Sequence, residues 1–161
     1  MDSVIEAEIA HTFFFADLAG FTALTEAMGD TDATDLAHDF YRAVAELAAV
    51  HDAQVVKLLG DAVMVRAEDA ARAIELALAI VHDVGGRHFF PTVRIGIHSG
   101  AAIERDGDWF EATVNLAARV AAQAAGGEVL LTEATRHAAG TLLGSRVANG
   151  VVASCATSPN R

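Results

Sequence analysis

Residues 53–67 read AQVVKLLGDAVMVRA, two apolar runs joined by Gly60 and Asp61. A Gly-Asp step between runs rich in Val and Leu is typical of a two-residue β-hairpin. The first run holds Lys57, the only lysine of the chain, four residues before Asp61. The simplest interpretation is an edge-strand lysine whose amine reaches water, followed by a solvated turn aspartate. The alternative is that both side chains bind a ligand.

The chain on either side of this hairpin alternates between short apolar runs and stretches with helical spacing of apolar residues. The predicted fold is α+β, a mainly antiparallel sheet with helices packed on it, and we expect the helices to cover one face. The sequence ERDGD is interpreted as a turn, and the end of the chain as one weak strand within 147–154 and a loose tail. The other predicted strands are 11–18, 92–103 and 128–132, and the predicted helices are about 22–28, 32–51, 68–84, 113–125 and 133–140.

The composition fits one globular domain, residues 1–161, with 11 basic and 22 acidic residues and a net charge of −11. Such a charge argues against nucleic acid or an anionic membrane as partner. The apolar runs fall short of the roughly 18–20 residues of a membrane span, and the acidic start is unlike a secretory signal. Because Cys155 is the only cysteine, a reducing compartment fits, and we expect a cytoplasmic domain without membrane insertion.

The stretch FFFADLAGFT (13–22) places Asp17 at the end of a hydrophobic strand, just before a glycine-containing turn and a helix start. A carboxylate beside a helix N-terminus suits a hard metal ion together with a phosphate group. The simpler interpretation is a strand followed by a capped turn. The backbone N–H groups expected to face the anion are those of Ala19, Gly20, Phe21 and Thr22.

Two further stretches can be linked to this one. If the hairpin pairs with the first strand, Asp61 lies beside Asp17, and two adjacent carboxylates repel unless a cation lies between them. Such a pair is typical of two-metal phosphoryl-transfer sites. In GDWFEATVNLAARV (107–120), Asn115 and Arg119 are four residues apart and share one helix face. That face is suited to a polyanion, although a surface helix with a solvated arginine has the same pattern.

Taken together, these stretches resemble the class III nucleotidyl cyclase catalytic domain. FFFADLAGFTALTE is similar to the first metal motif of that family, VVKLLGDAVM to its hairpin motif, and VRIGIHSG with GDWFEATVNLAARV to its third region. The resemblance runs from about residue 11 to about residue 136. It implies a ferredoxin-like, palm-like domain that converts ATP to 3′,5′-cyclic AMP and pyrophosphate.

The resemblance also implies roles for individual residues. Asp17 and Asp61 match the two metal-binding aspartates, which would hold two Mg²⁺ or Mn²⁺ ions with help from the backbone carbonyl of Leu18. Lys57 and Asp108 match the two positions that bind the purine. Lysine only donates hydrogen bonds and aspartate only accepts them, so the pair complements N1 and the 6-amino group of adenine. Guanine reverses both groups, at a cost of roughly 1–3 kcal/mol each, so we expect ATP to be preferred over GTP.

Asn115 matches the asparagine that orients the ribose, and Arg119 matches the arginine that stabilises the transition state. In the family the sites lie at a head-to-tail dimer interface, so the resemblance implies a homodimer with shared active sites. One chain would supply the aspartates, and its partner would supply the purine pair with Asn115 and Arg119.

Two features depart from the family pattern. Glu111 stands where the family has a glycine, and we expect weakened activity or altered dimerisation from its bulk and charge. Residues 141–161 are an atypical or truncated end without the usual lysine-bearing hairpin, and Arg146 is the nearest substitute for that lysine. These departures keep a second hypothesis open, a catalytically weak cyclase-like domain that binds nucleotide or acts as a regulatory interaction module. A nucleic-acid-binding α+β module is disfavoured by the acidic charge.

Overall fold

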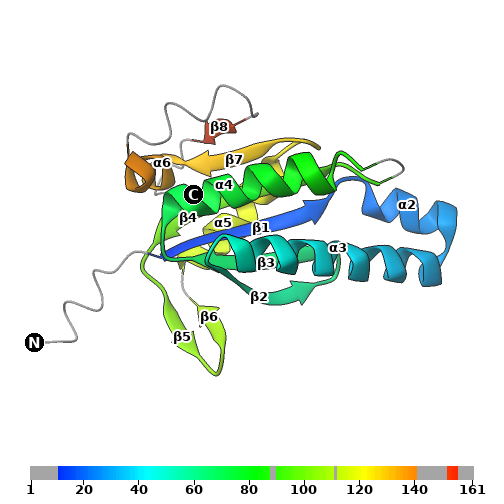
Figure 1. Cartoon of the computed structure of the whole chain (residues 1–161), viewed down its shortest axis with the longest axis horizontal. Coiled ribbons are helices and arrows are strands. Elements are labelled where there is room, and N and C mark those ends of the chain that lie inside the picture. The colour runs from blue at the N-terminus through cyan, green and yellow to red at the C-terminus, as the bar shows by residue number, and fades with distance from the viewer. Residues whose placement is uncertain (1–10, 88–89, 111, 141–151, 156–161) are drawn as a thin grey trace, which may run out of the picture.

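The structure, a computed structural model, describes residues 11–87, 90–110 and 112–140 and the backbone of 152–155. These residues form strands and helices that alternate along the chain (Figure 1). In order, they are β1 (His11–Leu18), α2 (Phe21–Met28), α3 (Asp30–Val50), β2 (Ala53–Leu59), β3 (Ala62–Ala67), α4 (Ala70–Ala79), a π-helical turn η1 (Ile80–Val84), β4 (Val93–Gly100), β5 (Ile103–Arg105), β6 (Asp108–Phe110), α5 (Ala112–Gln123), β7 (Val129–Thr132), α6 (Glu133–Ala139) and β8 (Val152–Cys155).

The main sheet has six strands in the order β2-β3-β1-β4-β7-β8. The aromatic strand β1 is central and runs antiparallel to both β3 and β4. The predicted hairpin joins β2 to β3, with Leu59 paired to Ala62 across a two-residue turn. Strands β7 and β8 continue the sheet in parallel beyond β4. The predicted α+β class with a mainly antiparallel sheet is therefore confirmed.

Side chains on the two faces of β1 belong to two separate hydrophobic clusters. Phe14 and Ala16 pack with residues of α3 and α4, which lie in front of the sheet in Figure 1. Phe13 and Phe15 point to the opposite face and pack against α5. The expectation that helices cover one face is therefore wrong. A strand with consecutive phenylalanines is buried on both sides, so it needs helices on both.

Close packing of α5 on the sheet depends on Gly96 in β4. A Cβ atom at this position would lie 2.0 Å from the backbone nitrogen of Ala121. On the other face, α4 begins at Asp69, whose carboxylate accepts the backbone N–H groups of Ala71 and Arg72 and caps the helix. These two local features fix one helix on each face of the sheet.

Two other elements differ from the sequence-based expectations. The stretch predicted as a single strand over 92–103 ends at Gly100, and ERDGD is the centre of a separate two-stranded ribbon, β5–β6. Asp106 and Gly107 take φ values of 52° and 80°, the left-handed conformation that a type I′ hairpin turn requires. The helix predicted over 68–84 changes at Ile80 from α-helical to the π-helical turn η1.

No helix in the part of the chain that the structure describes is both long enough and apolar enough to span a membrane.

Candidate active site

Two aspartates meet at the end of β1. Asp17 is paired in the sheet with Ala62 of β3 on one side and with Arg94 of β4 on the other. Asp61 immediately precedes Ala62 in the hairpin turn, where Gly60 takes a φ of 63°. The predicted pairing of the hairpin with the first strand therefore brings the two carboxyl groups together.

The two carboxyl groups are partly buried and lie close enough to repel each other when both are ionised. Burial and then the neighbouring Asp17 carboxylate raise the pKa of Asp61 from 3.8 to about 6. On Asp17, Oδ2 accepts hydrogen bonds from Nε and Nη2 of Arg94, at 3.1 and 2.8 Å. Oδ1 is buried and has no hydrogen-bond partner among the described residues. An unsatisfied carboxylate oxygen beside a second carboxylate is a site that a hard divalent cation would satisfy.

The two carboxylates form a donor set that suits a hard divalent cation. Among the described residues there is no group of three or more His, Cys, Asp or Glu side chains that would hold a metal. Mg²⁺ is usually bound through one or two carboxylates together with substrate phosphates. Asp17 and Asp61 match that pattern, in which the ligand completes the coordination.

Arg94 was missed in the sequence analysis. It lies between the buried residues Val93 and Ile95, on the face of the sheet that carries Asp17. The strand pattern of VRIGIHSG marks Arg94 as facing away from Val93 and Ile95. Arg94 lies opposite Asp17 because of the register in which β4 pairs with β1. That register cannot be predicted from the sequence pattern.

The turn after Asp17 is only partly available to an anion. The N–H group of Ala19 donates to the carbonyl of Thr92 at 2.8 Å and is therefore already engaged within the chain. Gly20 lies at the N-cap of α2 in the left-handed conformation, with φ 73° and without a side-chain cap. The N–H groups of the first helical turn, including Phe21 and Thr22, lack intrahelical partners by position. They remain candidates for binding an anion.

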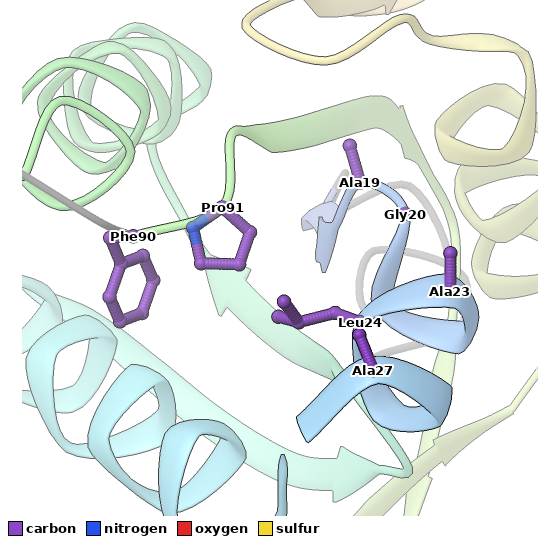
Figure 2. A pocket seen from close by; sticks show the side chains of 7 residues that line it. All are labelled: Ala19, Gly20, Ala23, Leu24, Ala27, Phe90 and Pro91. Atoms are coloured by element: carbon purple, nitrogen blue, oxygen red, sulfur yellow. The ribbon is translucent and has the colours of Figure 1, made fainter. Parts of the chain in front are cut away.

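A cavity of about 470 Å³ lies beside this turn. Figure 2 shows Leu24 of α2 projecting into the space opposite Phe90 and Pro91. Its other lining residues are Ala19, Gly20, Ala23 and Ala27. The lining side chains are all apolar. This cavity therefore has none of the charged groups of the aspartate site, and we treat the two as different sites.

Lys57 and Asp108, predicted as the purine-binding pair, contact each other directly. The Lys57 Nζ atom donates to Oδ2 of Asp108 at 2.7 Å. This hydrogen bond, together with one from the backbone N–H of Trp109, lowers the pKa of Asp108. A β-bulge between Val55 and Lys57 sets Lys57 opposite Met64, a residue of the α5 face. The bulge thus allows Val56 to pack on that face while the next side chain also reaches Asp108.

Asn115 and Arg119 both lie on the exposed side of α5, as their spacing predicts. The opposite side of the helix is buried through Val114, Ala117 and Ala121, against the face of the sheet that carries Asp17. Glu111 and Arg146, which the sequence analysis also singled out, lie outside the described residues, as does most of 141–161.

Comparison with known proteins identifies the family of the chain. The family model for the adenylate and guanylate cyclase catalytic domain matches residues 5–147. The chain belongs to this family, as the sequence motifs indicated. Its fold is thus that of a cyclase catalytic domain.

Individual relatives were also found. An adenylate cyclase of Streptomyces coelicolor is 40% identical over 120 residues, 74% of this chain and 32% of that protein. An adenylate cyclase of Streptomyces griseus is 41% identical over 106 residues, 66% of this chain and 27% of that protein. The chain thus spans about a third of the length of these curated relatives. The crystal structure of the adenylyl cyclase CyaB from P. aeruginosa superposes with a TM-score of 0.69 at 24% identity, covering 85% of this chain and 81% of that one.

Proposed function

We propose that this domain is an adenylate cyclase that converts ATP to 3′,5′-cyclic AMP and pyrophosphate. The observation that carries the proposal is the convergence of Asp17 and Asp61, with one buried carboxylate oxygen unsatisfied and the pKa of Asp61 raised to about 6. Both features show that the two ionised carboxylates are energetically unfavourable without a partner. A bound cation would pair with the unsatisfied oxygen and offset the repulsion between the two groups. The relatives named adenylate cyclase support the same reaction.

The metal-binding residues would be Asp17, Asp61 and the backbone carbonyl of Leu18, holding two Mg²⁺ or Mn²⁺ ions. When bound, such ions supply Lewis acidity to the ribose 3′-hydroxyl and to the phosphate oxygens. The chain adds positive charge at the same place through Arg94, which already contacts Asp17. The first turn of α2 adds the N–H groups of Gly20, Phe21 and Thr22 for the polyphosphate.

The remaining site residues would bind the nucleoside and the transition state. Lys57 and Asp108 form a donor–acceptor pair at 2.7 Å, which suits N1 and the 6-amino group of adenine. Asn115 would orient the ribose, and Arg119 would stabilise charge on the phosphorus centre. Both project from the exposed side of α5, where a substrate can reach them.

The domain would act as a homodimer whose two active sites are shared between chains. Three apolar side chains that are about half exposed support burial against a second copy. They are Leu59 at the hairpin turn (46%) and Ile103 and Phe110 on the β5–β6 ribbon (50% and 51%). The net charge of −11 supports our expectation that nucleic acid is not a partner. The single cysteine, Cys155, supports our expectation that the domain works in the cytoplasm.

The test is a direct assay of product. Purified protein is given ATP with Mg²⁺ or Mn²⁺, and cyclic AMP is measured for the wild type, for Asp17→Asn and for a control, Asp106→Asn, in an exposed turn. We expect the wild type and the control to form cyclic AMP, and Asp17→Asn to lose at least about 100-fold in rate, as for loss of an essential electrostatic group. Equal rates in wild type and Asp17→Asn would refute the assignment.

A second candidate is a cyclase-like domain that binds nucleotide without efficient turnover. Glu111, which stands at a family glycine position, favours it through added negative charge near a polyanion. Tight binding of α,β-methylene-ATP together with no detectable cyclic AMP would select this candidate. Efficient turnover would eliminate it.

A further inference from the structure

The β5–β6 ribbon carries Asp108, yet it projects away from the six-stranded sheet (Figure 1). Its two strands pair only with each other within the described residues. Of their six residues, Trp109 is the only one that is buried, with 7% of its surface exposed. Apart from the hydrogen bond from Lys57 of β2, the position of Asp108 relative to the sheet therefore depends on how Trp109 is held.

Trp109 is held by side chains from two strands of the main sheet. The guanidinium carbon of Arg66 on β3 lies 4.5 Å from the centre of the indole ring. The ring of His11, at the start of β1, lies 4.6 Å from it, and Phe13 lies 5.6 Å away. Arg66 also donates from Nη2 to Nδ1 of His11 at 2.8 Å. We call Arg66, Trp109 and His11 the tryptophan clamp.

Arg66 is mostly buried, which is rare for an arginine, with 15% of its side chain exposed. Its Nε atom is buried without a hydrogen-bond partner among the described residues. The carboxylate that pairs with Arg66 belongs to Glu68, which is exposed, and its Oε1 atom lies 3.4 Å from Nη2 of Arg66. A buried guanidinium is compensated here mainly by the indole face and the imidazole, so its contact with Trp109 is strong.

The clamp is linked directly to the purine-binding pair. The backbone N–H of Trp109 donates to Oδ1 of Asp108 at 2.8 Å. The other oxygen, Oδ2, accepts from Lys57. A shift of Trp109 would move this N–H group and with it the carboxylate. We propose that Arg66 and His11 are positioning residues that, through Trp109, fix Asp108 in the orientation that selects adenine over guanine.

The inference rests on the proposed function, because it assumes that Asp108 reads the base. It goes beyond that function by assigning selectivity to residues that do not touch the nucleotide. The competing explanation is that the clamp only contributes to folding. In that case its loss would lower stability without changing the preference between ATP and GTP.

The experiment measures binding rather than turnover, so it does not require an active enzyme. Dissociation constants for α,β-methylene-ATP and α,β-methylene-GTP are measured with Mg²⁺ for the wild type, Arg66→Gln, Arg66→Lys and Asp108→Ala. Arg72→Gln serves as the matched control, because Arg72 also forms an ion pair, with Asp52, but on α4. Trp109 is the only tryptophan of the chain, so its fluorescence reports the clamp independently in the same samples.

We expect Arg66→Gln to shift the tryptophan emission to longer wavelength and to reduce the preference for the adenine nucleotide about tenfold, the factor that corresponds to 1.4 kcal/mol. Arg66→Lys keeps the positive charge but loses the planar stacking on the indole ring. Its emission wavelength and its adenine preference should therefore lie between those of the wild type and Arg66→Gln. Arg72→Gln should change neither property.

Two negative results are distinguishable. Suppose that Asp108→Ala loses the preference for the adenine nucleotide, while Arg66→Gln keeps it despite a shifted emission. Then the positioning role of Arg66 and His11 is overturned, and base reading by Asp108 still holds. If Asp108→Ala itself keeps the preference, base reading by Asp108 is overturned, and the positioning inference with it. Thermal melting of each variant confirms that the comparison is made on folded protein.

Discussion

Replacing Asp61 by asparagine should stabilise the metal-free domain at neutral pH. The pKa of Asp61 is raised from 3.8 to about 6 in the folded chain, by burial and by Asp17. A shift of about two units corresponds to about 3 kcal/mol for a fully sheltered group. Asp61 is only half-buried, so solvent screening reduces this to about 1 kcal/mol.

The sign follows from the direction of the pKa shift. Because the folded state binds the proton more tightly, the favourable contribution is complete below about pH 4 and is lost as the pH rises through about 6. Wild type and Asp61→Asn should therefore differ little at pH 4.5. At pH 8 the variant should be more stable by about 1 kcal/mol.

The assay is urea unfolding in the presence of EDTA, at pH values between 4.5 and 8. Asp106→Asn, in the exposed turn of the β5–β6 ribbon, is the control and should show no such pH-dependent gain. Adding Mg²⁺ or Mn²⁺ should stabilise the wild type and not Asp61→Asn, because a ligand stabilises only the state that binds it. A gain that is independent of pH, or a loss of stability at pH 8, would refute the reasoning.

Three further predictions concern separate parts of the molecule. Gly96→Ala should lower the melting temperature by several degrees or prevent folding, because its Cβ would lie 2.0 Å from the Ala121 nitrogen; an unchanged melting curve would contradict the close approach of α5. Asp69→Ala should cost about 1 kcal/mol in urea unfolding by removing the cap of α4. Lys57→Glu combined with Asp108→Ser should shift the ratio of kcat/KM toward GTP, since glutamate accepts from N1–H of guanine and the serine hydroxyl can donate to O6; continued preference for ATP would refute the base assignment.

Much of the fold was predictable because local signals and burial agree. The apolar run of β1, the Gly-Asp turn of the hairpin and the helical spacing of Phe40 and Val44 in α3 each act within a few residues. The meeting of Asp17 and Asp61 followed from a single assumption, that the hairpin pairs with β1. The three consecutive phenylalanines of β1 indicate burial on both faces of the sheet, and therefore a helix such as α5 on the second face.

The missed features all depend on tertiary register. Arg94 contacts Asp17 only because β4 pairs with β1 at that residue. The tryptophan clamp combines Arg66, Trp109 and His11 from three strands, and their spacing in the sequence gives no sign of contact. The ribbon that carries Trp109 was interpreted as a turn, although Asp106-Gly107 is a hairpin signal of the same kind as Gly60-Asp61.

The most direct test of shared active sites is complementation between two inactive chains. Asp17→Ala and Asn115→Ala proteins are purified separately, mixed, and assayed for cyclic AMP formation from ATP against each protein alone. If one chain supplies the aspartates and the other supplies Asn115, each mixed dimer holds one intact site. Because random mixing makes half of the dimers mixed, activity should return to roughly a quarter of the wild-type rate. If both proteins are folded and the mixture stays as inactive as its components, the proposed shared site is wrong.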